Sequence, residues 1–354
     1  EFAINVYTVT LTAENGTVTG AGEYQHGQTA NIAATPAEGY NFVKWSDGNT
    51  EVTRSIVLEQ GKNTVGISYK VRNRSGKDVK LTVNPYFQFV PKGVRMAIDQ
   101  AFEVTENKII SNEQCLYFAT NAVSKAVPKR FVDTLYYSSD VEDGKMALGR
   151  SAVVQELTFE VAAGAEDIMN IVYSTEKSFP SVEEIKASVT TYRKALADQA
   201  GFTDEVATQL AVSADQFISH RNSTNGKTIL AGFPFFEDWG RDTMIALLGC
   251  CLSSRQFETA ESILRTFMAY CDKGLMPNLF PEGGNKPLYN TVDAALLFVV
   301  TIYEYYLRTK NVEFVKEAYP VMKEIVHWYR KGTDFEIRMD EDGLIMAGGG
   351  LDQV

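Results

Sequence analysis

The segment at 231–245, AGFPFFEDWGRDTMI, places three carboxylates and an arginine around a tryptophan. Buried charge is costly unless it is paired or contacts a ligand, so this clustering requires an explanation. An aromatic face can stack on a sugar ring, and carboxylate and guanidinium groups bind hydroxyls through charge-assisted hydrogen bonds. These residue types favour a carbohydrate site. The alternative is a plain helix start, with acidic residues near the positive end of the helix dipole and an exposed Arg–Asp pair.

Two later blocks extend this pattern. One reads GLMPNLFPE at 274–282, followed by YNTVDA at 289–294, and the other reads GLIMAG at 343–348, followed by LDQ at 351–353. In this order the three blocks resemble the glucosidase domain of glycogen debranching enzymes, amylo-α-1,6-glucosidases. That family usually has Gly-Tyr-Pro-Trp-Phe before Trp-Gly-Arg-Asp-Thr, then Gly-Leu-Ile-Pro-Asn, Tyr-Asn-Thr-Val-Asp-Ala and Thr-Trp-Met-Asp. The similarity covers roughly residue 67 to the end.

The resemblance implies that positions matching the family motifs bind glucose. These positions are Trp239, Arg241, Asp242, Asn278, Glu282, Tyr289, Asn290 and Asp293. Phe233 and Phe235 depart from the usual Tyr and Trp, which weakens the assignment of stacking and hydrogen bonding there. The family's general acid is the Asp of Thr-Trp-Met-Asp and its base comes much later, so we expect both catalytic carboxylates beyond Val354, and the chain is interpreted as an inactive fragment.

Structural roles remain open for three of these residues. Asn278 follows Pro277 and is also typical of a turn, whereas Glu282 is also typical of a solvated loop. Asp293 precedes an apolar helical pattern, where a carboxylate is common for structural reasons. Arg241 remains protonated in proteins, so it is predicted to hold sugar hydroxyls and to have no part in proton transfer.

Composition excludes several classes of partner and cofactor. The 354 residues carry a net charge of −11, which argues against binding to nucleic acid. No apolar run approaches the ~20 residues that a membrane span needs. The four cysteines are interpreted as free thiols, and no Cys/His cluster has metal-ligand spacing, so neither a metal nor an organic cofactor is implied. The expected partner is a glycogen-type or α-glucan oligosaccharide, and the oligomeric state stays open.

The pattern along the chain predicts an α+β multidomain protein that begins with a small β repeat domain at 1–66. This region resembles the divergent internalin-B-type repeat of bacterial surface proteins. Short alternating runs predict strands, and Asn15-Gly16 predicts a hairpin turn after the first of them. Tyr40, Phe42 and Trp45 could form a ligand platform, although Phe42 and Trp45 fit better as the core of so small a domain.

Two further domains are predicted after this repeat. Residues 67–177 contain many strand-like runs and are expected to form an antiparallel β-sandwich. Residues 178–354 have a helical period, and the resemblance implies that they form the N-terminal half of an (α/α)6 barrel. Stripes of apolar residues on these helices are interpreted as core faces, and a break is expected near Pro320. The stripes include Val206, Leu210 and Phe217, then Leu296, Val299, Val300 and Tyr303, then Val315, Tyr319, Met322, Val326 and Tyr329.

The sequence thus predicts a fragment of a debranching-type α-1,6-glucosidase that removes single glucosyl branch stubs with inversion. One alternative is another (α/α)6 glycosidase, such as a trehalase-like or mannosylglycerate-type hydrolase, because one fold serves several substrates. The other is a non-catalytic cell-surface glycan-binding protein. Free thiols and a storage polysaccharide favour the cytoplasm, whereas the repeat favours the cell surface or secretion. A half-barrel would also leave core faces exposed, which favours aggregation.

Overall fold

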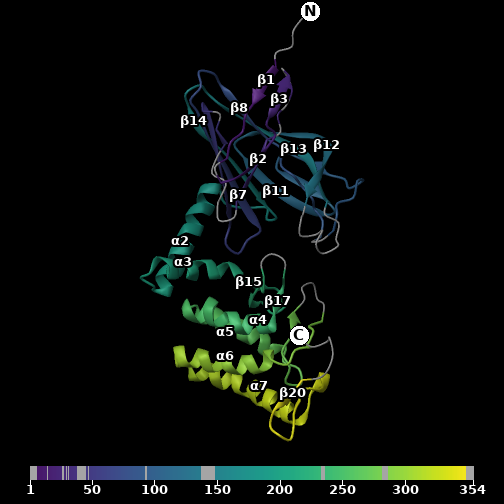
Figure 1. The fold of residues 1–354 in the computed structure, drawn as a ribbon, viewed down its shortest axis with the longest axis vertical. Coiled ribbons are helices and arrows are strands. Elements are labelled where there is room, and N and C mark those ends of the chain that lie inside the picture. Colours follow the sequence, from purple (N-terminus) through teal and green to yellow (C-terminus); the bar gives the residue numbers. More distant parts are fainter. Residues whose placement is uncertain are drawn as a thin grey trace, which may run out of the picture. The chain divides into compact units, whose positions relative to one another are not determined.

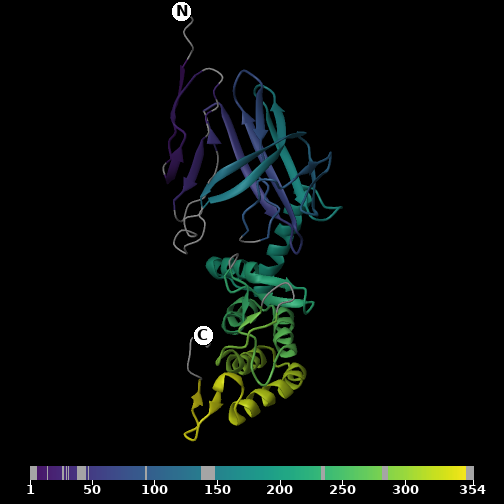
Figure 2. The same ribbon diagram turned by 90° about the vertical axis from the view of Figure 1, so that its right-hand side faces the viewer.

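A computed structural model describes residues 6–13, 15–25, 28, 30, 32–37, 45–46, 48–91, 94–136, 148–232, 236–280 and 286–347. The chain divides into two compact units, Glu1–Ala187 and Ser188–Val354 (Figures 1 and 2). The first unit contains strands, and the second contains helices with short strands between them. Each unit has its own hydrophobic core.

The strands of the first unit fall into four sheets. Their bounds are β1 Val6–Val9, β2 Gly16–Thr19, β3 Gly22–Gln25, β4 Ala33–Pro36, β5 Trp45–Ser46, β6 Thr50–Leu58, β7 Thr64–Asn73, β8 Val79–Val83, β9 Glu103–Val104, β10 Lys108–Ser111, β11 Gln114–Thr120, β12 Val123–Tyr136, β13 Leu148–Val161 and β14 Glu166–Ser174. The largest sheet has the order β5-β6-β7-β14-β11-β10-β9, a second has β12-β13-β8, and two pairs are β1-β3 and β2-β4.

The two larger sheets share one core and form an antiparallel sandwich (Figure 2). Val65, Ile67 and Tyr69 alternate on the face of β7 that packs against this core, opposite Tyr173, Ile171 and Met169 of β14. The β14 residues share the core with Val154 and Leu157 of β13. This alternation follows from the two-residue period of a strand, which sends every second side chain into the core.

Asn73 forms the corner where the chain leaves one sheet of the sandwich for the other. Its side-chain amide nitrogen donates to the carbonyls of Lys77, Val161 and Ala162 at 2.8, 3.2 and 2.9 Å. Its Oδ1 accepts from the backbone N–H of Ser75 at 2.9 Å. Asn73-Arg-Ser75 also matches the Asn-x-Ser pattern of N-glycosylation sites. Asn73 is only 1% exposed, however, so its amide has a structural role and is not accessible for glycosylation.

The hairpin predicted at Asn15-Gly16 is wrong. Strand β1 pairs with β3 and β2 pairs with β4, so the two strands flanking Asn15 have other partners. Gly16 lies in β2, where an added Cβ would approach the Thr35 carbonyl oxygen to 2.4 Å, so glycine is needed for close backbone contact. The predicted domain boundary at residue 66 falls inside β7 and stays a prediction, while Tyr40 and Phe42 lie outside the described residues.

Six α-helices occur in the described part of the chain, and the first of them crosses from one unit to the other. Their bounds are α2 Val182–Ala200, α3 Glu205–Ala214, α4 Gly240–Leu247, α5 Phe257–Ala269, α6 Ala294–Thr309 and α7 Val312–Lys331. Shorter helical turns are η1 Asp215–Phe217, η2 Leu248–Ser253 and η3 Asp334–Glu336. The strands of the second unit are β15 Ile218–Arg221, β16 Gly226–Ile229, β17 Asp238–Trp239, β18 Leu279–Phe280, β19 Arg338–Met339 and β20 Ile345–Met346.

In several helices of the second unit, residues that were predicted to face the core are exposed instead. Helix α6 buries Phe298, Ile302 and Tyr305, whereas Val300 and Tyr303 of the predicted stripe are 51% and 59% exposed. The other misassigned residues are Val206, Leu210 and Phe217 before β15, Leu296 on α6, and Tyr319 and Val326 on α7. In contrast, α5 buries one complete apolar face, which consists of Ala260, Ile263, Leu264 and Phe267.

Helix α7 continues through Pro320, so the predicted break is also wrong. Asn311 caps its start by accepting from the Phe314 N–H at 3.1 Å, and Gly332 follows its end. Pro320 lies on the exposed side, where water can solvate the carbonyl that loses its helical partner. The (α/α)6 barrel stays a prediction. None of the helices in the described residues is both long and apolar enough to span a membrane.

The exposed and buried faces of α6 should differ in how much stability a lysine substitution costs. We expect Val300→Lys to change the free energy of unfolding by less than ~0.5 kcal/mol, because its position is exposed. Ile302→Lys should cost more than ~3 kcal/mol, because Ile302 is 2% exposed and its replacement buries an unpaired charge. Urea unfolding followed by circular dichroism measures both. Equal losses in the two variants would contradict the orientation of α6.

Candidate sugar-binding site

Backbone hydrogen bonds align the two motif segments of the second unit. Strand β17 pairs antiparallel with β18, with Asp238 opposite Phe280 and Trp239 opposite Leu279. The Gly240 N–H donates to the Asn278 carbonyl at 2.8 Å, and the Asn278 N–H donates to the Leu288 carbonyl at 2.6 Å. Three stretches that are distant in sequence therefore lie side by side at the start of α4.

Gly240 allows this close approach. A Cβ added at Gly240 would lie 2.1 Å from the Pro277 carbonyl oxygen and 3.2 Å from the Cβ of Ala294. The first obstacle is backbone, which cannot rotate away as a flexible side chain can. The glycine of the Trp-Gly-Arg-Asp sequence is thus required where β17, the segment before β18 and α6 meet.

Arg241 and Asp293 form an ion pair between the first turns of two helices. The Arg241 Nε donates to Asp293 Oδ2 at 2.6 Å, and the Thr291 hydroxyl donates to Asp293 Oδ1 at 3.0 Å. Arg241 lies in the first turn of α4 and Asp293 is the N-cap residue of α6. Their side chains are 33% and 38% exposed, so a ligand can reach both.

Asn278, Asn290 and Tyr289 lie next to this pair in the folded segment. The Asn278 Nδ2 donates to Asn290 Oδ1 at 3.3 Å, and Asn278 is only 3% exposed. The Tyr289 hydroxyl donates to the Tyr270 carbonyl at 2.8 Å. Burial, helped by the nearby Asp272, raises the pKa of Tyr289 to about 12, so this hydroxyl remains protonated near neutral pH.

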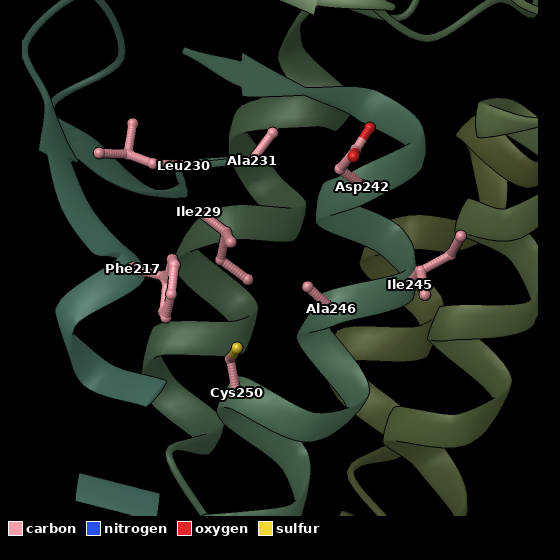
Figure 3. A pocket seen from close by; sticks show the side chains of 8 residues that line it. All are labelled: Phe217, Ile229, Leu230, Ala231, Asp242, Ile245, Ala246 and Cys250. Atoms are coloured by element: carbon pink, nitrogen blue, oxygen red, sulfur yellow. The ribbon is translucent and has the colours of Figure 1, made fainter. Parts of the chain in front are cut away.

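Asp242 follows Arg241 directly and lines a pocket of about 350 Å³ (Figure 3). Neither Arg241 nor Asp293 is among the lining residues of this pocket. The other lining residues are mostly apolar: Phe217, Ile229, Leu230, Ala231, Ile245, Ala246 and Cys250. Consecutive residues on a helix point in different directions, so one helix start serves two surfaces.

The outcome for the sequence-predicted residues is therefore mixed. The structure brings together Arg241 with Asp293 and Asn278 with Asn290, while half-buried Trp239 lies in the strand that leads to them. Glu282, Phe233 and Phe235 lie outside the described residues, as do residues 351–353. In the described part of the chain, no group of three His, Cys, Asp or Glu side chains could hold a metal ion.

Sequence reasoning missed the role of two buried charges behind β17. Arg221 Nη1 donates to both carboxylate oxygens of Asp238 at 2.7 Å. Burial raises the pKa of Asp238, while Thr228 and Arg221 act in the opposite direction. Asp238 was within the charged cluster, but nothing in the sequence near Arg221 marked it as the partner.

Two segments of the chain match known families. Residues 212–354 match the profile of the family described as Amylo-alpha-1,6-glucosidase. The resemblance to this family is confirmed for that segment. Residues 7–73 match the profile described as Divergent InlB B-repeat domain, which confirms the second resemblance. Both assignments concern segments, and each covers less than half of the chain.

Longer relatives extend well beyond the matched region. A glycogen debranching enzyme from Saccharomyces cerevisiae is 34% identical over 107 residues, which are 27% of this chain and 7% of the yeast protein. A crystal structure of a bacterial glucoamylase with acarbose has a TM-score of 0.48 at 12% identity and covers 85% of this chain and 48% of its own. A putative kojibiose phosphorylase from the human microbiome has a TM-score of 0.44 at 9% identity. The match covers 85% of this chain and 45% of the phosphorylase chain. The chain therefore spans less than half the length of these proteins.

Glycine substitutions test the close approach at β17. We expect Gly240→Ala to lower the free energy of unfolding by about 1–3 kcal/mol or more, because the new Cβ meets a backbone carbonyl. Gly249→Ala is the matched control. It lies in η2 with nothing within 4 Å of the added Cβ, so it should be neutral or stabilising by up to ~1 kcal/mol. Thermal unfolding compares the two, and an unchanged midpoint for Gly240→Ala would contradict the geometry.

Proposed function

We propose that this chain is part of a glucosidase that removes α-1,6-linked glucosyl branch stubs from glycogen-type glucans. The observation that carries the proposal is the accessible Arg241–Asp293 pair, which joins the starts of α4 and α6 within the segment that matches the amylo-α-1,6-glucosidase profile. The match to a debranching enzyme over part of its sequence supports the same substrate class.

The chemistry of the pair suits a sugar ring. A guanidinium group has five N–H donors in a fixed plane, and a carboxylate accepts several hydrogen bonds, so adjacent hydroxyls can bridge the two groups. An ion pair that is about one-third exposed contributes only ~0–1 kcal/mol to stability. Its position at two helix starts is therefore explained better by ligand binding than by folding.

The remaining predicted residues complete the proposed subsite. Trp239 supplies an aromatic face, and the Asn278–Asn290 pair holds the backbone beside Asp293. Glu282 and Asp242 belong to the proposed set because they match the family motifs. Asp242 lines a different pocket from the Arg241–Asp293 pair, so we assign it to a separate part of the glucan. We assign binding, not proton transfer, to all eight positions, including Tyr289.

Hydrolysis with inversion requires a carboxylic acid and a carboxylate base roughly 6.5–9.5 Å apart. Arg241 cannot serve as the base, and Asp293 is engaged by Arg241 and Thr291. The proposal therefore assigns both proton-transfer groups to carboxylates of a longer protein, beyond Val354. It needs no metal or organic cofactor, and a storage glucan as substrate favours the cytoplasm.

A second candidate is a non-catalytic glycan-binding protein at the cell surface. The observation that favours it is the match of residues 7–73 to the divergent InlB B-repeat profile. Both candidates bind a sugar at this surface. Only the glucosidase would also hydrolyse it.

The deciding experiment measures glucose released from a branched limit dextrin by this chain and by a longer protein that contains it. Release by the longer protein alone would support the debranching function and the assignment of the catalytic pair. Binding without release by a folded longer protein would favour the glycan-binding candidate. Release by this chain itself would overturn the assignment of proton transfer to carboxylates beyond Val354.

The role of Arg241 can be tested separately. We expect Arg241→Lys to weaken binding of the chain to branched limit dextrin roughly 10-fold or more, because the planar set of donors is lost. The matched control is Arg265→Lys, which alters another arginine–carboxylate pair, with Glu317 at 2.8 Å between α5 and α7. Titration calorimetry measures both, and equal affinities for the two variants would contradict a sugar-binding role for Arg241.

A further inference from the structure

The second unit contains a buried ion pair that the proposed sugar contacts do not use. Arg221 ends strand β15 and Asp238 begins β17, and they are 7% and 1% exposed. A single guanidinium nitrogen, Nη1, lies 2.7 Å from each oxygen of the Asp238 carboxylate. Charges at this depth are costly unless they are paired and hydrogen-bonded, so the pair must be matched to its surroundings.

Further contacts connect this pair to four strands. The Thr228 hydroxyl of β16 donates to Asp238 Oδ2 at 2.7 Å. Arg221 Nη1 also donates to the Phe280 carbonyl of β18 at 3.2 Å, and its guanidinium carbon lies 3.5 Å from the centre of the Phe280 ring. The Arg221 guanidinium of β15 thus contacts both β17 and β18 on their buried side. The Thr228 hydroxyl of β16 completes the contacts to Asp238.

This arrangement fixes the direction of the residues that follow Asp238. Successive side chains of a strand point to opposite sides, so an inward Asp238 turns Trp239 away from the buried pair. Trp239 is indeed half-buried. The N–H of the next residue, Gly240, donates a hydrogen bond to the Asn278 carbonyl at 2.8 Å. Arg241 then lies one step further along the same backbone.

We propose that Arg221 and Asp238 are positioning residues that hold Trp239 and Arg241 in the orientation that binds the glucan. This inference rests on the proposed function for its ligand but on the buried contacts for its geometry. A buried ion pair is commonly no more stabilising than apolar side chains of similar size, so stability alone does not explain this pair. Its charge-assisted hydrogen bonds, together with those to Thr228 and the Phe280 carbonyl, instead specify one register and one direction for β17.

The main test replaces the pair by apolar side chains of similar volume, in the double variant Arg221→Met with Asp238→Val. We expect a folded protein with a melting temperature near that of the parent, but with at least 10-fold weaker binding to branched limit dextrin in titration calorimetry. Parental affinity in a folded double variant would overturn the positioning role.

A milder variant keeps the test decisive if the double variant does not fold. Thr228→Val removes one hydrogen bond to Asp238 with little change in shape, and we expect a folded protein with affinity reduced about 2- to 10-fold. Thr224→Val is the control, because its hydroxyl contacts Thr266 at 3.1 Å and not Asp238. Equal affinities for the two threonine variants would overturn the proposal.

A ligand-independent measurement separates this inference from the proposed function. The chain has three tryptophans, so Trp45→Phe with Trp328→Phe leaves Trp239 as the single emitter. In that background we expect Thr228→Val and the double variant to change the emission and acrylamide quenching of Trp239. If the parent binds no glucan but the Trp239 signal shifts, the proposed function fails while the positioning role stands. An unchanged Trp239 signal in the folded variants overturns the positioning role.

Discussion

The candidate site depends on the close contact between Gly240 and the Pro277 carbonyl. An added Cβ would approach that oxygen to 2.1 Å, so the end of β17 and the segment at Pro277 can lie this close only at a glycine. The contact also allows the Gly240 N–H to reach the Asn278 carbonyl, which aligns the beginning of α4 with the loop before α6. Arg241 and Asp293 meet because their backbones are already fixed on both sides.

Two ion pairs within this segment illustrate how burial determines the role of a charge. Arg221 and Asp238 are almost fully buried, and the Asp238 carboxylate accepts hydrogen bonds from Arg221 and Thr228. Arg241 and Asp293 have a similar separation but remain about one-third exposed, so they retain access to hydroxyl groups from outside. The buried pair can specify geometry, whereas the exposed pair can exchange part of its hydration for a ligand.

The sequence predicted the elements well and the faces of the helices poorly. The family motifs grouped Arg241 and Asp293 in one site, and the structure brings these two side chains together at 2.6 Å. Helix α6, however, reads AALLFVVTIYEYYLRT and is apolar almost all round, so its period cannot identify the buried side. Likewise Asn15-Gly16 satisfies the local rule for a hairpin, but β1 and β2 take partners further along the chain. In both cases tertiary pairing decided between locally equivalent choices.

The exposed apolar side of α6 and α7 has the same physical origin as this ambiguity. A helix that is apolar all round can bury only one face against α4 and α5. The other face is buried only if a further layer of structure packs on it. Val300, Tyr303 and Val326 are each about half exposed in the described structure. Which face of such a helix is buried therefore depends on the elements that pack against it, and the periodicity of the helix alone does not encode that choice.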